Sequence, residues 1–336
     1  MKKVLIVGAG GFLGSHLLAE AASRPGVEVY AGVRESTSTR WFPKEGVNKV
    51  IFNFEDQADV ERVLTTTLPE GEKWDWIVYN LGATKCLHYQ EFEHINYGLL
   101  RTFVETLECT GMMPEKFLYI SSLSAMGPGR DRDYTPFDEK MIPQPNTRYG
   151  ASKLKAEMLL QMHSVPYIIF RCTGIYGPRD KDYFLMFDAM RKGFDFSVGF
   201  RKQMLTFIYA PDLAKAVFDA LEKAPVKEIY NIAEPRAYSQ TEFRGIVAKK
   251  LGKRLVVPVR VPLWGTKAVS WVCEKIGVAR GVPSTLNTDK YNIMKQRNWS
   301  VDTRKAREAF GFVAPTSLRE GVSESIDWYK KEGWMK

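Results

Sequence analysis

Cysteine is scarce in this sequence, whose 336 residues include only Cys86, Cys109, Cys172 and Cys273. The four are widely separated, and none has a neighbour at the short spacing of a C-x-x-C pair or a zinc site. A chain long enough to bury a full core does not need disulfide bonds. We therefore expect reduced thiols, a cytoplasmic location and no metal site.

Long hydrophobic runs are also missing, and no uncharged apolar stretch reaches the roughly 18–20 residues needed to cross a bilayer. The nearest candidate, Val256–Val278, is interrupted by two prolines and four charged residues. Within it, Trp264, Ala268, Trp271 and Val272 share one face at helical spacing. We interpret this face as buried or substrate-lining, in preference to attachment to a membrane surface.

The N-terminus has two features of a secretory signal peptide. Lys2 and Lys3 precede an apolar run, and Ala19-Glu20-Ala21 imitates a cleavage site. Glycines interrupt that run between residues 8 and 14, as they do where a strand leads into a tight turn. We therefore expect the segment to be retained as a strand and helix.

Charge is unbalanced, because 48 Lys and Arg outnumber 39 Asp and Glu and give a net charge of +9. Hydrophobic residues at 45% and charged residues at 26% exclude a mainly disordered chain. The segment 236–260 holds seven Lys and Arg against Glu242. Without a basic–aromatic motif we interpret it as a solvated helix face, and we expect no nucleic-acid or membrane partner.

Short apolar runs alternate with amphipathic segments through the first half. We expect strands at 3–7, 27–33, 49–54, 76–80, 117–121 and 167–171, and helices at 12–23, 56–67, 92–109 and 149–163. This alternation predicts an α/β fold with a doubly wound parallel sheet. Later we expect a strand at 228–232 and helices at 183–192, 212–223, 239–251, 303–310 and 318–331.

The domain prediction follows from where this alternation weakens, after Gly174. Residues 1–172 and about 210–235 are expected to form a nucleotide-binding domain. Residues about 173–209 and 236–336 are expected to form a smaller, discontinuous and mainly helical substrate domain.

A glycine loop, Gly8-Ala9-Gly10-Gly11-Phe12-Leu13-Gly14, follows the first predicted strand and begins the first helix. Gly8 permits a tight turn, Gly11 lets the backbone approach a pyrophosphate, and Gly14 allows close packing of the helix. The N–H groups at the helix start, near Phe12 and Leu13, favour an anion. This context predicts a dinucleotide site.

The residues after the second strand bear on the choice of dinucleotide. A carboxylate there binds the adenosine ribose, whereas arginine accommodates a 2′-phosphate. Arg34 comes directly after the strand, next to Glu35 and several hydroxyl residues. Arg34 favours NADP, while Glu35 leaves NAD as the second choice.

Tyr149 and Lys153 begin a predicted helix, and their spacing of four places them on one face. A free tyrosine has a pKa near 10, and a nearby ammonium together with an oxidised nicotinamide would stabilise its phenolate. Ser121, Ser122 and Ser124 follow a strand at the sheet edge where such folds bind ligands. A serine hydroxyl there is placed to hydrogen-bond a substrate oxygen beside Tyr149.

Taken together, these motifs resemble the extended short-chain dehydrogenase/reductases, the NAD-dependent epimerase/dehydratase group. The resemblance covers nearly the whole chain and runs through the glycine loop, Asn80–Ala83, Ile95–Gly98, Ile120–Gly127, the Tyr149/Lys153 pair, Arg171–Asp180, Asp302–Ala306 and Leu318–Gly321. It implies a Rossmann sheet and a homodimer formed through the helices around 92–109 and 149–163.

The resemblance also implies residue roles. Tyr149 resembles the general acid/base, Lys153 its electrostatic partner and ribose ligand, and Ser122 the hydroxyl that polarises the substrate, with Ser121 or Ser124 as alternatives. Asn96 resembles an asparagine that orders a proton relay, although a structural role fits equally. The remaining residues implied to contact the cofactor are Asn53 and Phe54 beside the adenine, and Leu81, Gly82, Ala83 and Thr173.

Two features bear on the substrate. Sugar-nucleotide enzymes of this group often carry an arginine that grips the diphosphate, where this chain has Leu205. Thr173-Gly174, and Asn287–Lys290 leading to Trp299, resemble the 3β-hydroxysteroid dehydrogenase and dihydroflavonol reductase branches. Arg201 or Lys202 remains an alternative diphosphate ligand.

The main hypothesis is an NAD(P)(H)-dependent oxidoreductase that interconverts a secondary alcohol and a ketone on a small, fairly apolar molecule. The alternative is a nucleotide-sugar epimerase or dehydratase with retained NAD. A third hypothesis is a dinucleotide-sensing regulator or nucleic-acid binder on the same fold, which the intact Tyr149/Lys153 pair disfavours. The sequence leaves open the substrate, the direction and the stereochemistry.

Overall fold

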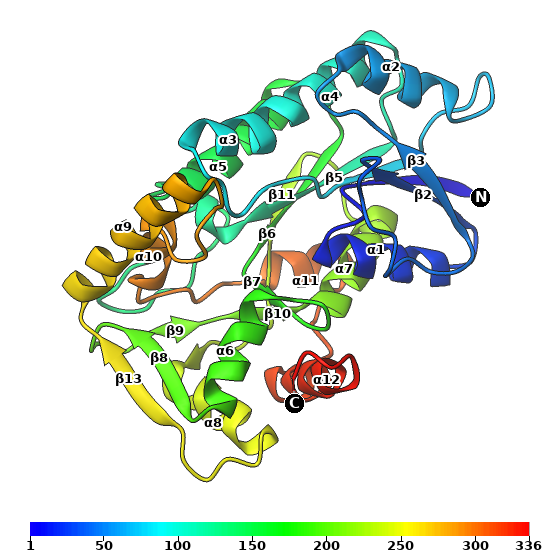
Figure 1. Cartoon of the computed structure of the whole chain (residues 1–336). Coiled ribbons are helices and arrows are strands. Elements are labelled where there is room, and N and C mark those ends of the chain that lie inside the picture. The colour runs from blue at the N-terminus through cyan, green and yellow to red at the C-terminus, as the bar shows by residue number, and fades with distance from the viewer. Residues whose placement is uncertain (336) are drawn as a thin grey trace.

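A seven-stranded parallel sheet forms the centre of the computed structural model, which describes residues 1–335 (Figure 1). Its strand order is β11-β6-β5-β4-β1-β2-β3. The strands are β1 (Lys2–Val7), β2 (Val27–Val33), β3 (Val47–Ile51), β4 (Trp76–Tyr79), β5 (Lys116–Ser122), β6 (Tyr167–Cys172) and β11 (Glu228–Ile232). The chain reverses direction across the sheet between β1 and β4, where such sheets bind ligands. This confirms the predicted doubly wound sheet.

Alternating side chains of each strand point to opposite faces of the sheet and create two separate cores. Val4 and Ile6 of β1 face one core, under α1 (Phe12–Ser23), α7 (Ala210–Lys223) and α11 (Arg304–Phe310). Leu5 and Val7 face the other, under α2 (Gln57–Thr66), α4 (Leu99–Cys109) and α5 (Arg148–Met162). Strands buried on both sides therefore read as continuous apolar runs.

Side-chain caps define where several helices begin. Asp56 accepts from backbone N–H groups at the start of α2, and Thr147 accepts from that of Gly150 in α5. Ser239 and Ser317 form capping boxes that begin α8 (Gln240–Lys250) and α12 (Leu318–Lys331). Each cap satisfies N–H groups that have no partner within the helix.

The second half contains more strand than the sequence predicts. Three two-stranded sheets pair β10 with β7, β12 with β9 and β13 with β8. Their bounds are β7 (Gly174–Tyr176), β8 (Phe194–Val198), β9 (Met204–Leu205), β10 (Phe207–Tyr209), β12 (Tyr238–Ser239) and β13 (Val257–Val261). These pairings join segments far apart in sequence, and short strands leave little periodicity to detect. The predicted domain division stays a prediction.

The predicted helix 92–109 is divided in the structure. It consists of α3 (Tyr89–Glu93), a π-helical turn (His94–Gly98) and α4. The remaining α-helices are α6 (Asp182–Arg191), α9 (Leu263–Arg280) and α10 (Thr288–Met294).

The expected buried face in α9 is wrong. Trp264, Trp271 and Val272 expose 78%, 57% and 45% of their surface, and Ala268 is also exposed. The buried residues of α9 are instead Thr266, Ser270 and Gly277. Among residues 1–335, no helix combines the length and apolar character required to span a bilayer.

Candidate active site

The glycine loop leaves β1 and turns sharply into α1. Gly8 has a φ of +80°, and a Cβ there would lie 2.8 Å from the backbone nitrogen of Leu81. A Cβ on Gly14 would lie 2.4 Å from the carbonyl oxygen of Gly8. Gly11 begins α1 without a side-chain cap and is exposed. The N–H groups at this helix start are therefore available to an anion.

The loop after β2 folds over the glycine loop. The methyl group of Thr37 occupies the space where a Cβ of Gly10 would lie. Arg34 is exposed and forms no ion pair within residues 1–335, whereas Arg40 pairs with Glu332 at 3.3 Å. Arg34 thus differs from Arg40 in having its guanidinium free of a carboxylate partner in the described part of the chain.

The tyrosine and serine predicted to act together lie near each other. Thr147 caps α5 and places Tyr149 in its first turn, against Ser122 at the end of β5. Burial raises the pKa of Tyr149 to about 12, and the neighbouring Ser122 hydroxyl acts in the opposite direction on that pKa. Ser121 instead donates to the buried carboxylate of Glu157. The geometry therefore favours Ser122 as the hydroxyl beside Tyr149.

Lys153 lies one turn further along α5 and is fully enclosed. Its Nζ donates to the carbonyl oxygen of Ile120 at 2.7 Å and to the hydroxyl of Tyr119 at 3.0 Å. Burial lowers the pKa of Lys153 to about 8, because a desolvated ammonium is unfavourable. In this structure burial is the largest influence on the pKa of both groups. The expected stabilisation of the phenolate by Lys153 together with an oxidised nicotinamide stays a prediction.

Asn96 connects the loop after β4 to the catalytic helix. Its Oδ1 accepts from the N–H of Ala83, and its Nδ2 donates to the carbonyl of Ala83 and to Ser152. A Cβ on Gly82 would lie 2.9 Å from that Oδ1 and 3.4 Å from Nζ of Lys153. All polar atoms of the Asn96 side chain are thus bonded to protein, which fits the structural role.

The remaining predicted cofactor residues occupy different surroundings. Asn53 is exposed after β3, and its Oδ1 accepts from the backbone N–H of Glu55 at 3.3 Å. Phe54 is buried and stacks on Phe52, so its ring belongs to the core. The hydroxyl of Thr173 is buried after β6, with no hydrogen-bond partner among the described residues. A bound ligand can provide that partner.

Sequence reasoning missed a buried ion pair next to Ser121 and one turn of α5 after Lys153. Glu157 and Arg171 are 0% and 3% exposed and form a bidentate pair, with NH2 to Oε2 at 2.6 Å. The pair joins α5 to β6. Two features of the sequence could have indicated this pair. Glu157 stands four residues after Lys153, and Arg171 is the only charged residue of its strand.

Two further contacts hold the site in place. Asp289 of α10 accepts from the backbone N–H of Tyr149 at 3.0 Å. His16 of α1 contacts the carbonyl oxygen of Pro178 at 2.9 Å, and burial lowers its pKa to about 4. Asp289 and Pro178 lie in segments that carry the family resemblance, but these contacts with residues distant in sequence were not predicted.

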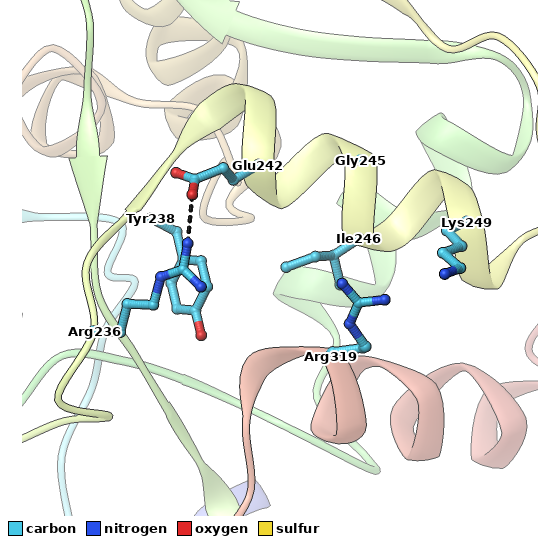
Figure 2. Close-up of a pocket in the computed structure, with 7 residues that line it drawn as sticks. All are labelled: Arg236, Tyr238, Glu242, Gly245, Ile246, Lys249 and Arg319. Carbon is cyan, nitrogen blue, oxygen red and sulfur yellow. Dashed lines mark hydrogen bonds and ion pairs between the residues drawn. The ribbon is translucent and has the colours of Figure 1, made fainter.

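A separate surface depression of about 250 Å³ lies between α8 and α12. Figure 2 shows Arg319 reaching into it from α12 and Arg236 paired with Glu242 across its other end. None of the predicted site residues lines it. Within residues 1–335, no cluster of His, Cys, Asp or Glu has the arrangement of a metal site.

The family profile described as "NAD dependent epimerase/dehydratase family" matches residues 4–233. The chain belongs to this family. The match covers the glycine loop, Ser122, the Tyr149/Lys153 pair and Thr173. The protein is therefore an NAD(P)-dependent enzyme of the extended short-chain dehydrogenase/reductase type.

Characterised proteins similar to this chain are named for different reactions. Mouse (Mus musculus) dTDP-D-glucose 4,6-dehydratase is 24% identical over 346 residues, spanning 98% of this chain and 89% of the relative. The decarboxylating sterol-4-alpha-carboxylate 3-dehydrogenase of Dictyostelium discoideum is 23% identical, with 96% and 100% covered. Ceramide reductase of Caulobacter vibrioides is 24% identical, with 99% and 96% covered.

Solved structures share the fold of this family member. The dTDP-glucose 4,6-dehydratase of Bacillus anthracis in complex with NAD has a TM-score of 0.77 at 18% identity and covers 100% of this chain and 99% of its own. RMD from Pseudomonas aeruginosa complexed with NADPH has a TM-score of 0.73 at 16% identity, with 99% and 100% covered. Both cofactors thus occur on this fold.

Proposed function

We propose that this enzyme interconverts a secondary alcohol and a ketone on a small, fairly apolar molecule, with net turnover of a nicotinamide dinucleotide. The proximity of Tyr149, in the first turn of α5, to Ser122 at the end of β5 carries the proposal, with Lys153 buried one turn further along α5. A proton donor and a second hydroxyl would then meet at the carboxyl end of β5, which is the ligand-binding edge of such a sheet.

In the reducing direction, Tyr149 donates a proton to the substrate oxygen while Ser122 donates a hydrogen bond to the same oxygen. A bound nicotinamide supplies the hydride. The charged form of Lys153 favours the phenolate that remains, since an ammonium stabilises a neighbouring anion. In the oxidising direction the same groups act in reverse order.

The proposal of an apolar substrate rests on Leu205, which stands where sugar-nucleotide enzymes often have a diphosphate-binding arginine. Leu205 lies in β9, where its partly buried side chain offers no charge. The names of two relatives, a sterol dehydrogenase and a ceramide reductase, support the same class. A nucleotide-sugar epimerase or dehydratase with retained NAD is the second candidate, favoured by the dTDP-D-glucose dehydratases and by exposed Arg201 and Lys202.

The cofactor proposed is NADP(H), with NAD second, because Arg34 is free for a 2′-phosphate. The remaining features proposed are a cytoplasmic location, supported by four free thiols, and a homodimer through α4 and α5.

The test is nicotinamide turnover with two substrate panels. We expect NADPH oxidation with apolar ketones such as steroid and long-chain ketones, and none with UDP- or dTDP-sugars. Tyr149→Phe should lower the ketone rate by about 10²–10⁴-fold. A sugar nucleotide converted without net cofactor turnover would establish the second candidate instead.

A further inference from the structure

Helix α9 has an inverted distribution of side chains. The residues it buries against the protein, Thr266, Ser270 and Gly277, are small or polar. The residues it exposes are large and apolar: Leu263, Trp264, Val269, Trp271, Val272, Ile276 and Val278, each at least 43% exposed. A helix on a water-facing surface normally shows the opposite distribution, with its apolar stripe toward the core. In Figure 1 this helix forms the outer edge of the molecule beside α10.

More apolar side chains are exposed on the segments that lead into α9. β13 runs into the helix through Pro262, and it pairs with β8 in a two-stranded ribbon (Figure 1). Phe194 and Phe196 of β8 are 46% and 55% exposed, and Val257 of β13 lies opposite Phe194 and is 43% exposed. A Cβ on Gly199, after β8, would lie 3.6 Å from the side chain of Leu263 at the start of α9, so the two segments are close together. The exposed apolar residues therefore continue from the ribbon to the helix.

The charged residues around this surface are almost all basic. Residues 253–281 contain six Lys and Arg against the one acid Glu274. All six are exposed, and none forms an ion pair with any residue between 1 and 335: Lys253, Arg254, Arg260, Lys267, Lys275 and Arg280. The exposed side of α9 thus carries Trp264 and Trp271 interleaved with lysine and arginine, and tryptophan and basic side chains are the residues that favour the headgroup region of an anionic bilayer.

The inner side of α9 is connected to the catalytic tyrosine. Glu274 of α9 lies 3.9 Å from Arg148, the residue before Tyr149, and accepts from the backbone N–H of Thr288. The next residue, Asp289, accepts from the N–H of Tyr149. A single side-chain contact, between Glu274 and Arg148, thus joins α9 to the start of α5.

We propose that the outer face of α9, with the adjoining β8–β13 ribbon, docks on an anionic lipid bilayer. The helix lies in the interface without crossing it, with Trp264 and Trp271 among the lipid headgroups and the basic residues beside lipid phosphates. This placement brings the active site next to the apolar phase. The docking itself is independent of the reaction, while its use for taking up an apolar substrate rests on the proposed function. It revises the expectation that the chain has no membrane partner.

The test is flotation of the full chain with vesicles, measured without cofactor or substrate. We expect binding to phosphatidylcholine vesicles that contain about one third phosphatidylglycerol, and binding weaker by about tenfold or more to phosphatidylcholine alone or at high salt. Trp264→Gln combined with Trp271→Gln should lower binding by about tenfold or more. Lys267→Gln combined with Lys275→Gln should reduce binding to the anionic vesicles toward that on neutral ones.

The matched control is Ile142→Gln with Val313→Gln, which changes two apolar residues that are 82% and 57% exposed, close to the 78% and 57% of the tryptophans. This control should bind as the unchanged chain does. The proposal is wrong if the unchanged chain does not bind, or if the control and the tryptophan variant lose binding equally. It is also wrong if the tryptophan variant dissociates a dimer into monomers, because the face then covers a second copy. An inactive chain that binds vesicles would overturn only the proposed function.

Discussion

Burial of Tyr149 and Lys153 shifts the pKa of each side chain in the direction that favours its uncharged form. The pKa of Tyr149 is raised to about 12 by burial, and the pKa of Lys153 is lowered to about 8 by burial. The lysine amine is held by Tyr119 and Ile120 rather than exposed to water. The protonation of Lys153 therefore changes within an accessible pH range, whereas that of Tyr149 does not.

A pH dependence of ketone reduction follows from Lys153. Its ammonium form is present below the lowered pKa and is lost as the pH rises through about 8. We expect kcat/KM at saturating NADPH to be flat on the acid side and to fall as the pH rises through that value. The profile is measured with one ketone across neutral and alkaline pH.

Tyr119→Phe offers a direct check on this assignment. The hydroxyl of Tyr119 accepts from Lys153, so its loss destabilises the charged amine and should move the fall to lower pH by about one unit. Tyr79→Phe is the matched control, because the hydroxyl of Tyr79 is buried with no partner in residues 1–335. A flat profile, or equal shifts in the two variants, would contradict the assignment.

Arg34 should determine cofactor preference. Arg34→Ala removes a charge-assisted contact to the 2′-phosphate, so KM for NADPH should rise by about 10–100-fold while KM for NADH stays unchanged. Arg40→Ala is the control, since Arg40 is already paired with Glu332 and lies over Trp41. Initial rates with both cofactors decide this, and equal losses for NADH and NADPH would disprove the phosphate contact.

The residues proposed to carry the chemistry are easier to recognise in the sequence than the residues that contact them in the fold. The glycine loop, Ser122, Tyr149 and Lys153 are recognisable because each motif is local and has a fixed spacing. Asp289 is not, since its contact with Tyr149 spans 140 positions and needs only one carboxylate at the right place. Exposure of α9 was also unpredictable, because apolar periodicity identifies a face without saying what covers it.

At the scale of elements, the π-helical turn His94–Gly98 carries Asn96 between the loop after β4 and α5. Asn96→Ala leaves buried partners of that side chain unpaired, and the free energy of unfolding should fall by about 1–3 kcal/mol. The loosened loop should raise KM for the cofactor more than it lowers kcat. Urea unfolding and initial rates measure the two effects.

Ser152→Ala is the control for Asn96, because it removes only one of the three hydrogen bonds that the Asn96 side chain makes. Its loss of stability should be smaller. If Asn96→Ala leaves KM unchanged and lowers kcat alone, Asn96 serves a proton relay and the structural role is wrong.

Elements with strong periodicity were predicted closely. β2 at Val27–Val33 and α12 at Leu318–Lys331 match their predicted bounds, because β2 is rich in valine and α12 begins at a capping box on Ser317. The division of 92–109 was not foreseen, since a π turn keeps helical periodicity nearly intact. The β8–β13 ribbon pairs residues 63 positions apart, such as Phe194 and Val257, which local patterns do not report.

At the scale of the whole molecule, the expected dimer makes a prediction about α5. Met158 and Met162 lie one turn apart on that helix and are 53% and 82% exposed. Met158→Glu combined with Met162→Glu places charges in the expected interface and should convert a dimer to monomers in sedimentation velocity. Ile142→Glu should leave the dimer intact. A monomer in the unchanged chain, or a dimer insensitive to the methionine pair, would contradict this interface.

The central claim is that the enzyme transfers hydride to its substrate with net cofactor turnover. The most direct measurement supplies NADPH deuterated at both C4 positions together with an apolar ketone, and analyses the product by mass spectrometry. We expect an alcohol with deuterium on the carbinol carbon, one for each NADPH oxidised. A product formed without deuterium from the added cofactor would show that the enzyme does not transfer this hydride to its substrate.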